Sequence, residues 1–277
     1  MMNLYLNGEF LPLDQGRISV EDRGFQFGDG VYEVVRVYRG KPFRLEKHLA
    51  RLEQSVKGVE ILMPEPVAKV SEVCRTLVKG LEEGQIYLQV TRGSAPRVHA
   101  FPQDLRPTFV AYVRPVTPHA PDRVYALKTV VDDRWGRCNL KTICLLPNIL
   151  GKQRAIEAKC DEGLFVRDGI VTEGTSSNAF FVRDGALLTH PSDNRILNGV
   201  TREAVLEIAR QLGVRVRFQG VTIVDATASQ EAFVTGTLTE IMPAVSIDGK
   251  PVGSGKVGPV TLKLKNAFRE LTAKECG

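Results

Sequence analysis

The feature that most limits the fold of this chain is a series of short β-rich runs joined by turn dipeptides. The dipeptides are Asn7-Gly8, Arg39-Gly40, Asp168-Gly169 and Asp184-Gly185. Asn-Gly and Asp-Gly pairs accept the positive φ angles that two-residue hairpin turns require. Strands joined by such turns lie antiparallel. The last two turns fall in identical FVRDG segments, and two copies predict a meander rather than a solenoid.

Helical patterns are mixed with these hairpins. Apolar residues repeat at helical spacing in residues 44–61 and 64–84. Two more helices are expected, one opened by Pro147 and one within residues 198–214. Further strands are expected in residues 85–93, 106–114, 124–138 and 231–247. Because regular strand-helix-strand alternation is scarce, and neither GxGxxG nor GxxxxGK[ST] occurs, the predicted fold class is α+β rather than a doubly wound sheet.

A proline-rich segment divides the chain. Residues 113–123 contain three prolines and no periodic pattern, so a central strand or a helix is not expected to continue through them. A chain of 277 residues is also long enough for two domains. The sequence therefore predicts a small N-terminal domain over residues 1–114, a linker over 115–122 and a larger C-terminal domain over 123–277.

Composition narrows the function class. The net charge of +5 comes from 37 Lys+Arg and 32 Asp+Glu that are scattered rather than clustered, which argues against nucleic-acid binding and suits small anionic substrates. The five cysteines form no CxxC pair, so neither a disulfide framework nor a metal site is predicted. The start of the chain carries no signal pattern, and no apolar run approaches the roughly 18 residues of a membrane span. We expect a cytoplasmic protein without a membrane partner.

One lysine stands in an unusual setting. Lys141 lies between Leu140 and an apolar run in the stretch DRWGRCNLKTICLLP, residues 133–147. Lysine is rarely buried, and its charged end normally reaches water. One interpretation is structural: Lys141 ends an edge strand and pairs with a carboxylate. The other is chemical: the amine is kept dry and neutral enough to form a Schiff base with a carbonyl.

Other residues fit an aldehyde cofactor such as pyridoxal phosphate. Its ring nitrogen needs a carboxylate, and its phosphate needs an arginine and a helix N-terminus. Glu173 lies on a turn in VTEGTSSNAF, Thr201 opens an amphipathic helix, Gly236 and Thr237 end the strand AFVTG, and Arg51 flanks a helix stripe. Each has a plainer interpretation as a solvated turn acid, a simple helix cap, a small turn or a surface charge.

Six motifs, in order, carry a resemblance that covers almost the whole chain. They are EDRGFQFGDGVYEVVRVYRG, TRGSAPRVHAFP, RWGRCNLKT, VTEGTSSN, ILNGVTR and FVTGT. Together they closely resemble the fold-type IV, or class IV, pyridoxal phosphate aminotransferases, and most of all the bacterial members that act on D-amino acids. The resemblance implies two α/β domains with the cofactor between them.

The resemblance also implies roles for individual residues. Lys141 would be the Schiff-base lysine and proton shuttle, and Glu173 would pair with the pyridine nitrogen. Leu197 would pack behind the cofactor ring. The phosphate would be held by Arg51, Val200, Thr201, Gly236 and Thr237.

The substrate side follows from the same resemblance. Tyr32, Arg97 and His99 match the family's trap for the substrate α-carboxylate. In relatives the loop with the arginine and histidine comes from the neighbouring subunit, which implies a homodimer with a shared active site. Since Lys141 approaches Cα from one fixed face, the position of this trap decides which enantiomer is accepted.

The expected activity is ping-pong transamination of D-amino acids, such as D-alanine and D-glutamate, with 2-oxo acids such as 2-oxoglutarate or pyruvate. Leu238 departs from the small hydroxyl residues usual in D-specific relatives. A branched-chain L-amino acid aminotransferase on the same fold is an alternative. An aminodeoxychorismate lyase and a basic binding protein without cofactor are further alternatives. The Arg97 and His99 pair argues against the lyase.

Overall fold

The structure, a computed structural model, describes residues 3–277 and consists of two compact units. Unit 1 comprises the chain up to Pro118 together with Leu140–Cys144 and Lys274–Gly277. Unit 2 comprises His119–Asn139 and Leu145–Ala273. The expected division into residues 1–114, 115–122 and 123–277 stays a prediction about independent domains. It did not include the two short segments, Leu140–Cys144 and Lys274–Gly277, that belong to unit 1.

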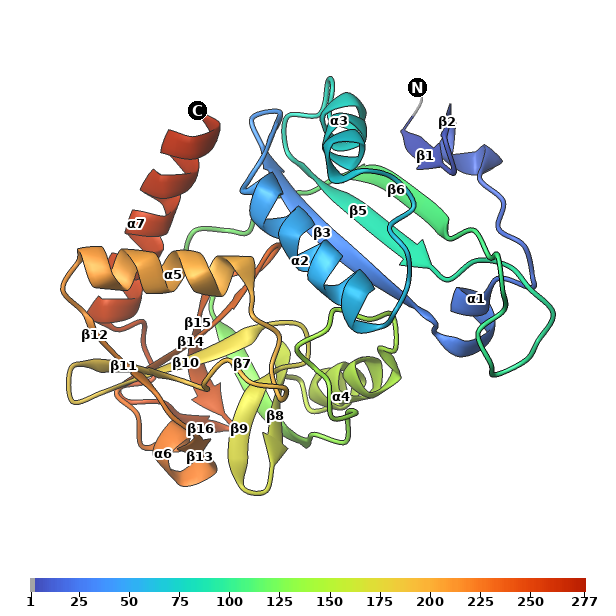
Figure 1. The fold of residues 1–277 in the computed structure, drawn as a ribbon. Coiled ribbons are helices and arrows are strands. Elements are labelled where there is room, and N and C mark those ends of the chain that lie inside the picture. The colour runs from blue at the N-terminus through green and yellow to red at the C-terminus, as the bar shows by residue number, and fades with distance from the viewer. Residues whose placement is uncertain (1–2) are drawn as a thin grey trace. The chain divides into compact units, whose positions relative to one another are not determined.

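Unit 1 contains a six-stranded antiparallel sheet in the order β2-β1-β6-β5-β3-β4 (Figure 1). Its strands are β1 (Leu4–Leu6), β2 (Glu9–Leu11), β3 (Gly30–Tyr38), β4 (Lys41–Pro42), β5 (Gly84–Thr91) and β6 (Thr108–Pro115). The predicted hairpins are confirmed: β1 pairs with β2 and β3 with β4. The turn residues have positive φ: 49° at Asn7, 107° at Gly8, 48° at Arg39 and 76° at Gly40.

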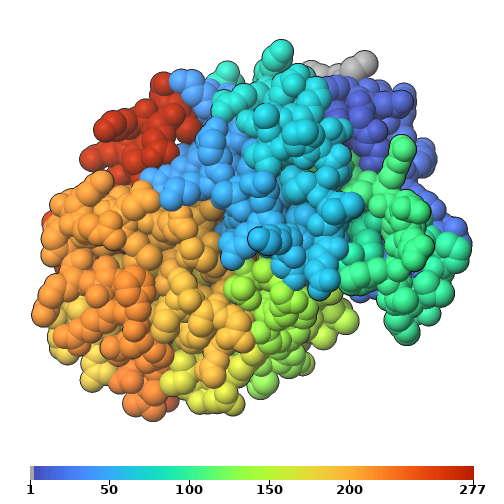
Figure 2. Space-filling view, viewed as in Figure 1, coloured from blue at the N-terminus to red at the C-terminus, as the bar shows by residue number. Residues whose placement is uncertain are grey.

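Two of the helices of unit 1 cover this sheet. The expected amphipathic helices are α2 (Leu45–Gly58) and α3 (Val67–Leu77), and their outer faces lie at the surface in Figure 2. Their apolar stripes contribute Leu49, Leu52, Val70 and Cys74 to one buried cluster with the strands. Burial of each large apolar side chain contributes about 1.5–3 kcal/mol. The short helix α1 (Arg23–Phe27) was not predicted, although the Asp22 side chain caps it by accepting from Gly24 N at 2.8 Å.

Unit 2 is built on a ten-stranded mixed sheet in the order β12-β11-β10-β14-β15-β7-β8-β9-β13, with β16 paired to β15. The strands are β7 (Tyr125–Val131), β8 (Glu162–Arg167), β9 (Ile170–Gly174), β10 (Asn178–Arg183), β11 (Ala186–Thr189), β12 (Arg215–Phe218), β13 (Val221–Thr222), β14 (Glu231–Gly236), β15 (Glu240–Ile247) and β16 (Lys250–Pro251). The two predicted Asp-Gly hairpins are confirmed as β8-β9 and β10-β11. Three strand pairs are parallel, namely β7-β8, β7-β15 and β11-β12.

The helices of unit 2 are α4 (Leu146–Glu157), α5 (Val200–Gln211), α6 (Ile223–Thr227) and α7 (Pro259–Cys276), of which the last three residues belong to unit 1. Pro147 lies in the first turn of α4, as expected. Helices α4 and α5 connect the parallel pairs β7-β8 and β11-β12, so the unit holds two helical crossovers. No helix in residues 3–277 is both long and apolar enough to cross a membrane.

Two glycines of unit 1 allow a matched stability test. Gly8 and Gly93 have nearly the same positive φ, 107° and 105°, but a Cβ on Gly8 would meet nothing within 4 Å, whereas one on Gly93 would lie 2.0 Å from Arg106 O. We expect Gly8→Ala to cost about 1–2 kcal/mol from backbone strain. Gly93→Ala should cost about 1–3 kcal/mol more because its neighbour is backbone. Urea unfolding of both variants checks the difference, and equal losses would contradict it.

Candidate active site

Lys141 is placed by a short segment that runs beside β3. Tyr32 N donates to Lys141 O at 2.9 Å, Lys141 N donates to Ser55 Oγ at 3.0 Å, and a β-bridge joins Val31 to Thr142. These contacts all lie in unit 1. The backbone of Lys141 is therefore fixed by β3 and α2, independently of its side chain.

The side chain of Lys141 is half-buried and lies over an aromatic ring. Its Nζ is 4.0 Å from the centroid of the Tyr32 ring, which in turn stacks on Tyr87 at 5.8 Å. No carboxylate in residues 3–277 forms an ion pair with Lys141, and Lys141 belongs to no named strand. The structural interpretation, an edge-strand lysine paired with an acid, is therefore wrong. An amine held on a ring face without an acidic partner remains able to react.

Arg51 belongs to a buried cluster of charges in unit 1. Its Nε and Nη2 donate to the two carboxylate oxygens of Glu33 at 2.9 and 2.7 Å, and His48 Nδ1 lies 3.0 Å from Glu33 Oε1. Burial alone would raise the pKa of Glu33, but Arg51 and His48 hold it well below its usual range. Burial lowers the pKa of His48, against the opposing effect of Glu33. Arg51 is thus a fixed cation rather than the loose surface charge of the plainer interpretation.

The loop with Arg97 and His99 is exposed but anchored at its base. Buried Arg23 donates from Nη1 to Val98 O at 2.6 Å and from Nη2 to His99 O at 3.3 Å. Arg97 lies over the Phe27 ring, 4.8 Å from its centroid. Within the described chain, no hydrogen bond or ring contact joins either residue to Tyr32. The three expected carboxylate ligands are thus not brought together inside one chain.

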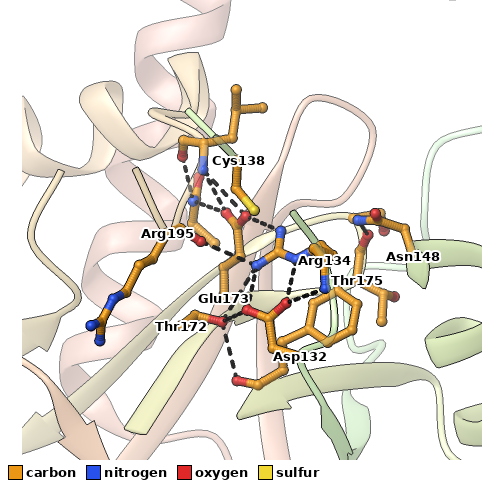
Figure 3. Close-up of polar contacts among 12 residues, drawn as sticks. Asp132, Arg134, Cys138, Asn148, Thr172, Glu173, Thr175 and Arg195 are labelled. Atoms are coloured by element: carbon orange, nitrogen blue, oxygen red, sulfur yellow. Dashed lines mark hydrogen bonds and ion pairs between the residues drawn. The ribbon is translucent and has the colours of Figure 1, made fainter. Parts of the chain in front are cut away.

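Glu173 is the central acid of unit 2. It lies near the end of β9, is buried, and accepts hydrogen bonds from Arg134 Nη1 at 2.5 Å, Asn178 Nδ2 at 2.9 Å and the Leu197 backbone N–H at 3.1 Å (Figure 3). Burial raises the pKa of Glu173 to about 7, although Arg134 acts in the opposite direction. A carboxyl group that titrates near neutrality can hold or release a proton under ordinary conditions. This excludes the plainer interpretation of a solvated turn glutamate.

The start of α5 and the end of β14 offer donors for an anion. Helix α5 begins after Gly199, which provides no side-chain cap, so the amides around Val200 and Thr201 remain available. Thr237 follows β14 directly. The buried hydroxyls of Ser177 and Thr235 have no hydrogen-bond partner among the described residues. Thr235 of β14 pairs with Asn178 of β10, the residue that follows Ser177.

These observations fit pyridoxal phosphate. Unsatisfied buried hydroxyls and an uncapped helix start suit its phosphate, and the buried acid suits its ring nitrogen. The Leu197 backbone is tied to that acid, which places Leu197 beside it. Gly236 ends β14 next to Thr237. No cluster of His, Cys, Asp and Glu in residues 3–277 has the geometry of a metal site.

Sequence reasoning missed two charged residues of this region. Arg134 and Asp132 lie just after β7 and contact Glu173 directly or through one another. Both stand in the stretch DDRWGRC, a few positions before Lys141. The signal for them is an acid and an arginine two positions apart after a β-rich run, a pattern too common to point to a site.

Comparison with known proteins decides the family. The family described as Amino-transferase class IV matches residues 30–247. The chain belongs to the class IV aminotransferases. The predicted family, the α+β fold class and the aminotransferase class are thereby confirmed. The cofactor of this family is pyridoxal phosphate, as expected.

Individual relatives match this chain over nearly its full length. The D-alanine aminotransferase of Bacillus licheniformis is 38% identical over 278 residues, which covers 99% of this chain and 98% of the relative. The branched-chain amino acid aminotransferase of Escherichia coli has a similar structure, with a TM-score of 0.92, 26% identity and coverage of 99% and 96%. The branched-chain amino acid aminotransferase of Thermoproteus uzoniensis, solved with norvaline, has a TM-score of 0.90, 26% identity and coverage of 99% and 95%.

Proposed function

We propose that this enzyme transaminates D-amino acids, such as D-alanine and D-glutamate, with 2-oxo acids such as 2-oxoglutarate or pyruvate. The observation that carries the proposal is the 38% identity, over 99% of the chain, to a relative named D-alanine aminotransferase. The amine of Lys141 on the Tyr32 ring and the buried acid Glu173 support it, because the reaction needs a nucleophilic base and a carboxylate at the ring nitrogen.

Each residue expected at the cofactor has a proposed role. Glu173 would pair with the ring nitrogen, Leu197 would pack against the ring, and the phosphate would be held by Val200, Thr201, Gly236 and Thr237. Lys141 would be the point of attachment, and Arg51 would also bind the phosphate. The bidentate contact of Arg51 with Glu33 fixes the arginine in direction, so little side-chain entropy would be lost when an anion binds.

The chemical work of the chain would be proton transfer. When bound, pyridoxal phosphate acts as an electron sink that makes the substrate Cα–H acidic. Lys141 Nζ would take the proton from the substrate Cα and deliver it, on the same face, to the C4′ carbon of the cofactor, and Glu173 would keep a proton on the ring nitrogen by pairing with it. Two half-reactions that use one site in turn give ping-pong kinetics.

The substrate α-carboxylate would be held by Tyr32 together with Arg97 and His99 of a second copy of the chain. The loop is exposed, its carbonyls are anchored by Arg23, and it makes no hydrogen bond to Tyr32 of its own chain among the described residues. An exposed arginine on an anchored loop can bind a carboxylate in a neighbouring subunit. We therefore propose a homodimer with a shared active site. The five cysteines are free, which suits a cytoplasmic enzyme.

A half-reaction test separates the D-amino acid function from its main alternative. The high TM-scores to branched-chain enzymes make L-leucine the appropriate competitor. We expect D-alanine to bleach the visible band of the cofactor in a single turnover, with L-leucine at least about 100-fold slower. L-Alanine is the matched control for the configuration at Cα, and D-leucine is the matched control for side-chain size. Faster bleaching by L-leucine than by D-alanine would assign the enzyme to the branched-chain class.

A further inference from the structure

A chain of alternating charges runs behind Glu173 in unit 2. Arg167 Nη2 donates to Asp132 Oδ1 at 2.9 Å, and Arg134 binds both oxygens of Asp132, through Nε at 2.8 Å and Nη2 at 2.9 Å. Arg134 Nη1 then donates to Glu173 Oε1 at 2.5 Å (Figure 3). The order is cation, anion, cation, anion, and it ends at the acid that faces the cofactor in the proposed function.

Arg134 is fixed in this chain from several sides. Its side chain is 7% exposed, its guanidinium carbon lies 4.4 Å from the centroid of the buried Phe165 ring, and Nη2 also donates to Arg195 O at 3.2 Å. Asp132 is held in turn by Thr172, whose Oγ1 donates at 2.8 Å. An arginine with both edges of its planar fork engaged has one orientation. Its third nitrogen therefore points at Glu173 in a defined geometry.

We propose that Arg134, anchored by Asp132, is a positioning residue that fixes the Glu173 carboxylate and favours its anionic form for the ring nitrogen of pyridoxal phosphate. The proposal deepens the proposed function and rests on it for the role of Glu173. The contact between Arg134 and Glu173 does not depend on that role.

The charges around Glu173 make Arg134 the group that decides its ionisation. Arg134 and the Leu197 amide favour the anion, whereas burial and Asp132 favour the acid. Arg202 of α5 and the Cys138 thiol also interact electrostatically with Glu173. Of these groups, only Arg134 is a cation in direct hydrogen-bond contact with the carboxylate, and its pKa is raised further by Asp132 and Glu173 in spite of burial. Removal of this cation would leave a buried acid that prefers to be neutral.

The test is a titration of Glu173 in the full-length protein without cofactor. Infrared difference spectra in D2O resolve the carboxylic acid band, and the band lost in Glu173→Gln identifies the residue. We expect the midpoint in Arg134→Gln to rise by about 1–3 pH units relative to wild type. Arg134→Lys keeps a cation but cannot engage Asp132 and Glu173 together, so its midpoint should lie between the two. This second variant keeps the test decisive if Arg134→Gln does not fold.

Arg167→Gln is the matched control, because Arg167 also binds Asp132 but does not contact Glu173. Its midpoint should stay within about 0.5 pH units of wild type. An unchanged midpoint in Arg134→Gln and Arg134→Lys, or an equal rise in Arg167→Gln, would overturn the proposal. In the holoenzyme, the visible absorption of Arg134→Gln should shift with pH over the same higher range. Failure of the wild type to bind pyridoxal phosphate would instead reject the proposed function and leave the titration result valid.

Discussion

Replacement of Lys141 by alanine is expected to abolish transamination while the fold is kept. The side chain supplies the only amine that lies over the Tyr32 ring among the described residues, so no neighbour can take over its role as nucleophile and base. Loss of such a group typically lowers kcat by about 10⁴–10⁶-fold. The stability should change by no more than about 1 kcal/mol, because the hydrogen bonds of this segment involve backbone atoms and Ser55.

Three measurements check this expectation. Single-turnover kinetics with D-alanine give the rate, the visible spectrum gives the bound aldehyde, and borohydride reduction with peptide mapping locates the attachment. In the wild type the label should appear at Lys141, and in the variant it should be absent. Lys57→Ala is the control, since Lys57 is an exposed lysine of α2 in the same unit. A label at another lysine, or a variant with wild-type rates, would contradict the assignment.

The second large effect is expected at Glu33. Glu33→Gln leaves the buried Arg51 without its counter-charge, and the loss of one partner of a buried ion pair typically costs about 3–5 kcal/mol. Glu46→Gln is the control: Glu46 pairs with Arg75 at the surface, 2.8 Å away, with 74% of its side chain exposed. This second change should cost less than about 1 kcal/mol. Urea unfolding followed by circular dichroism compares the two.

The effect of Glu33→Gln should depend on pH in a defined direction. The pKa of Glu33 is lower in the folded chain than in the unfolded one, so its stabilising contribution is complete above the unfolded value of about 4.3 and is lost as the pH falls towards the folded value. Wild type and variant should therefore converge in acid. A gap that persists undiminished at pH 3 would show that the ion pair is not its source.

Local signals predicted the local part of the fold. Turn dipeptides with positive φ, such as Asn7-Gly8 and Arg39-Gly40, determine the hairpins through backbone sterics alone, and helical spacing determined α2 and α3. The parallel pairs of β7 with β8 and β15 depend on which distant strands meet, and no local pattern encodes that choice. Helix α7 was missed because the acid that caps its first turn lies outside its own sequence: Glu231 of β14 accepts from Val260 N at 3.0 Å and from Thr261 N at 2.7 Å.

The candidate site likewise had parts that local sequence signals could predict and parts that only tertiary contacts determine. Lys141 and Glu173 could be singled out because their residue types are unusual beside apolar or small neighbours, and the resemblance then gave them roles. Arg134 could not, because its importance comes from Asp132 and Glu173 on separate segments that the fold brings within hydrogen-bond distance. An ordinary arginine becomes a positioning residue only through tertiary structure.

The interleaving of the two units has a consequence for how such enzymes can be recombined. A chimera joined once, after Pro118, would take β3 from one parent and the lysine segment Leu140–Cys144 from the other. The Val31–Thr142 bridge and the hydrogen bond from Tyr32 N to Lys141 O would then join residues from different parents. Exchange of specificity between relatives therefore calls for a graft of three pieces, in which residues 140–144 and 274–277 travel with the first 118.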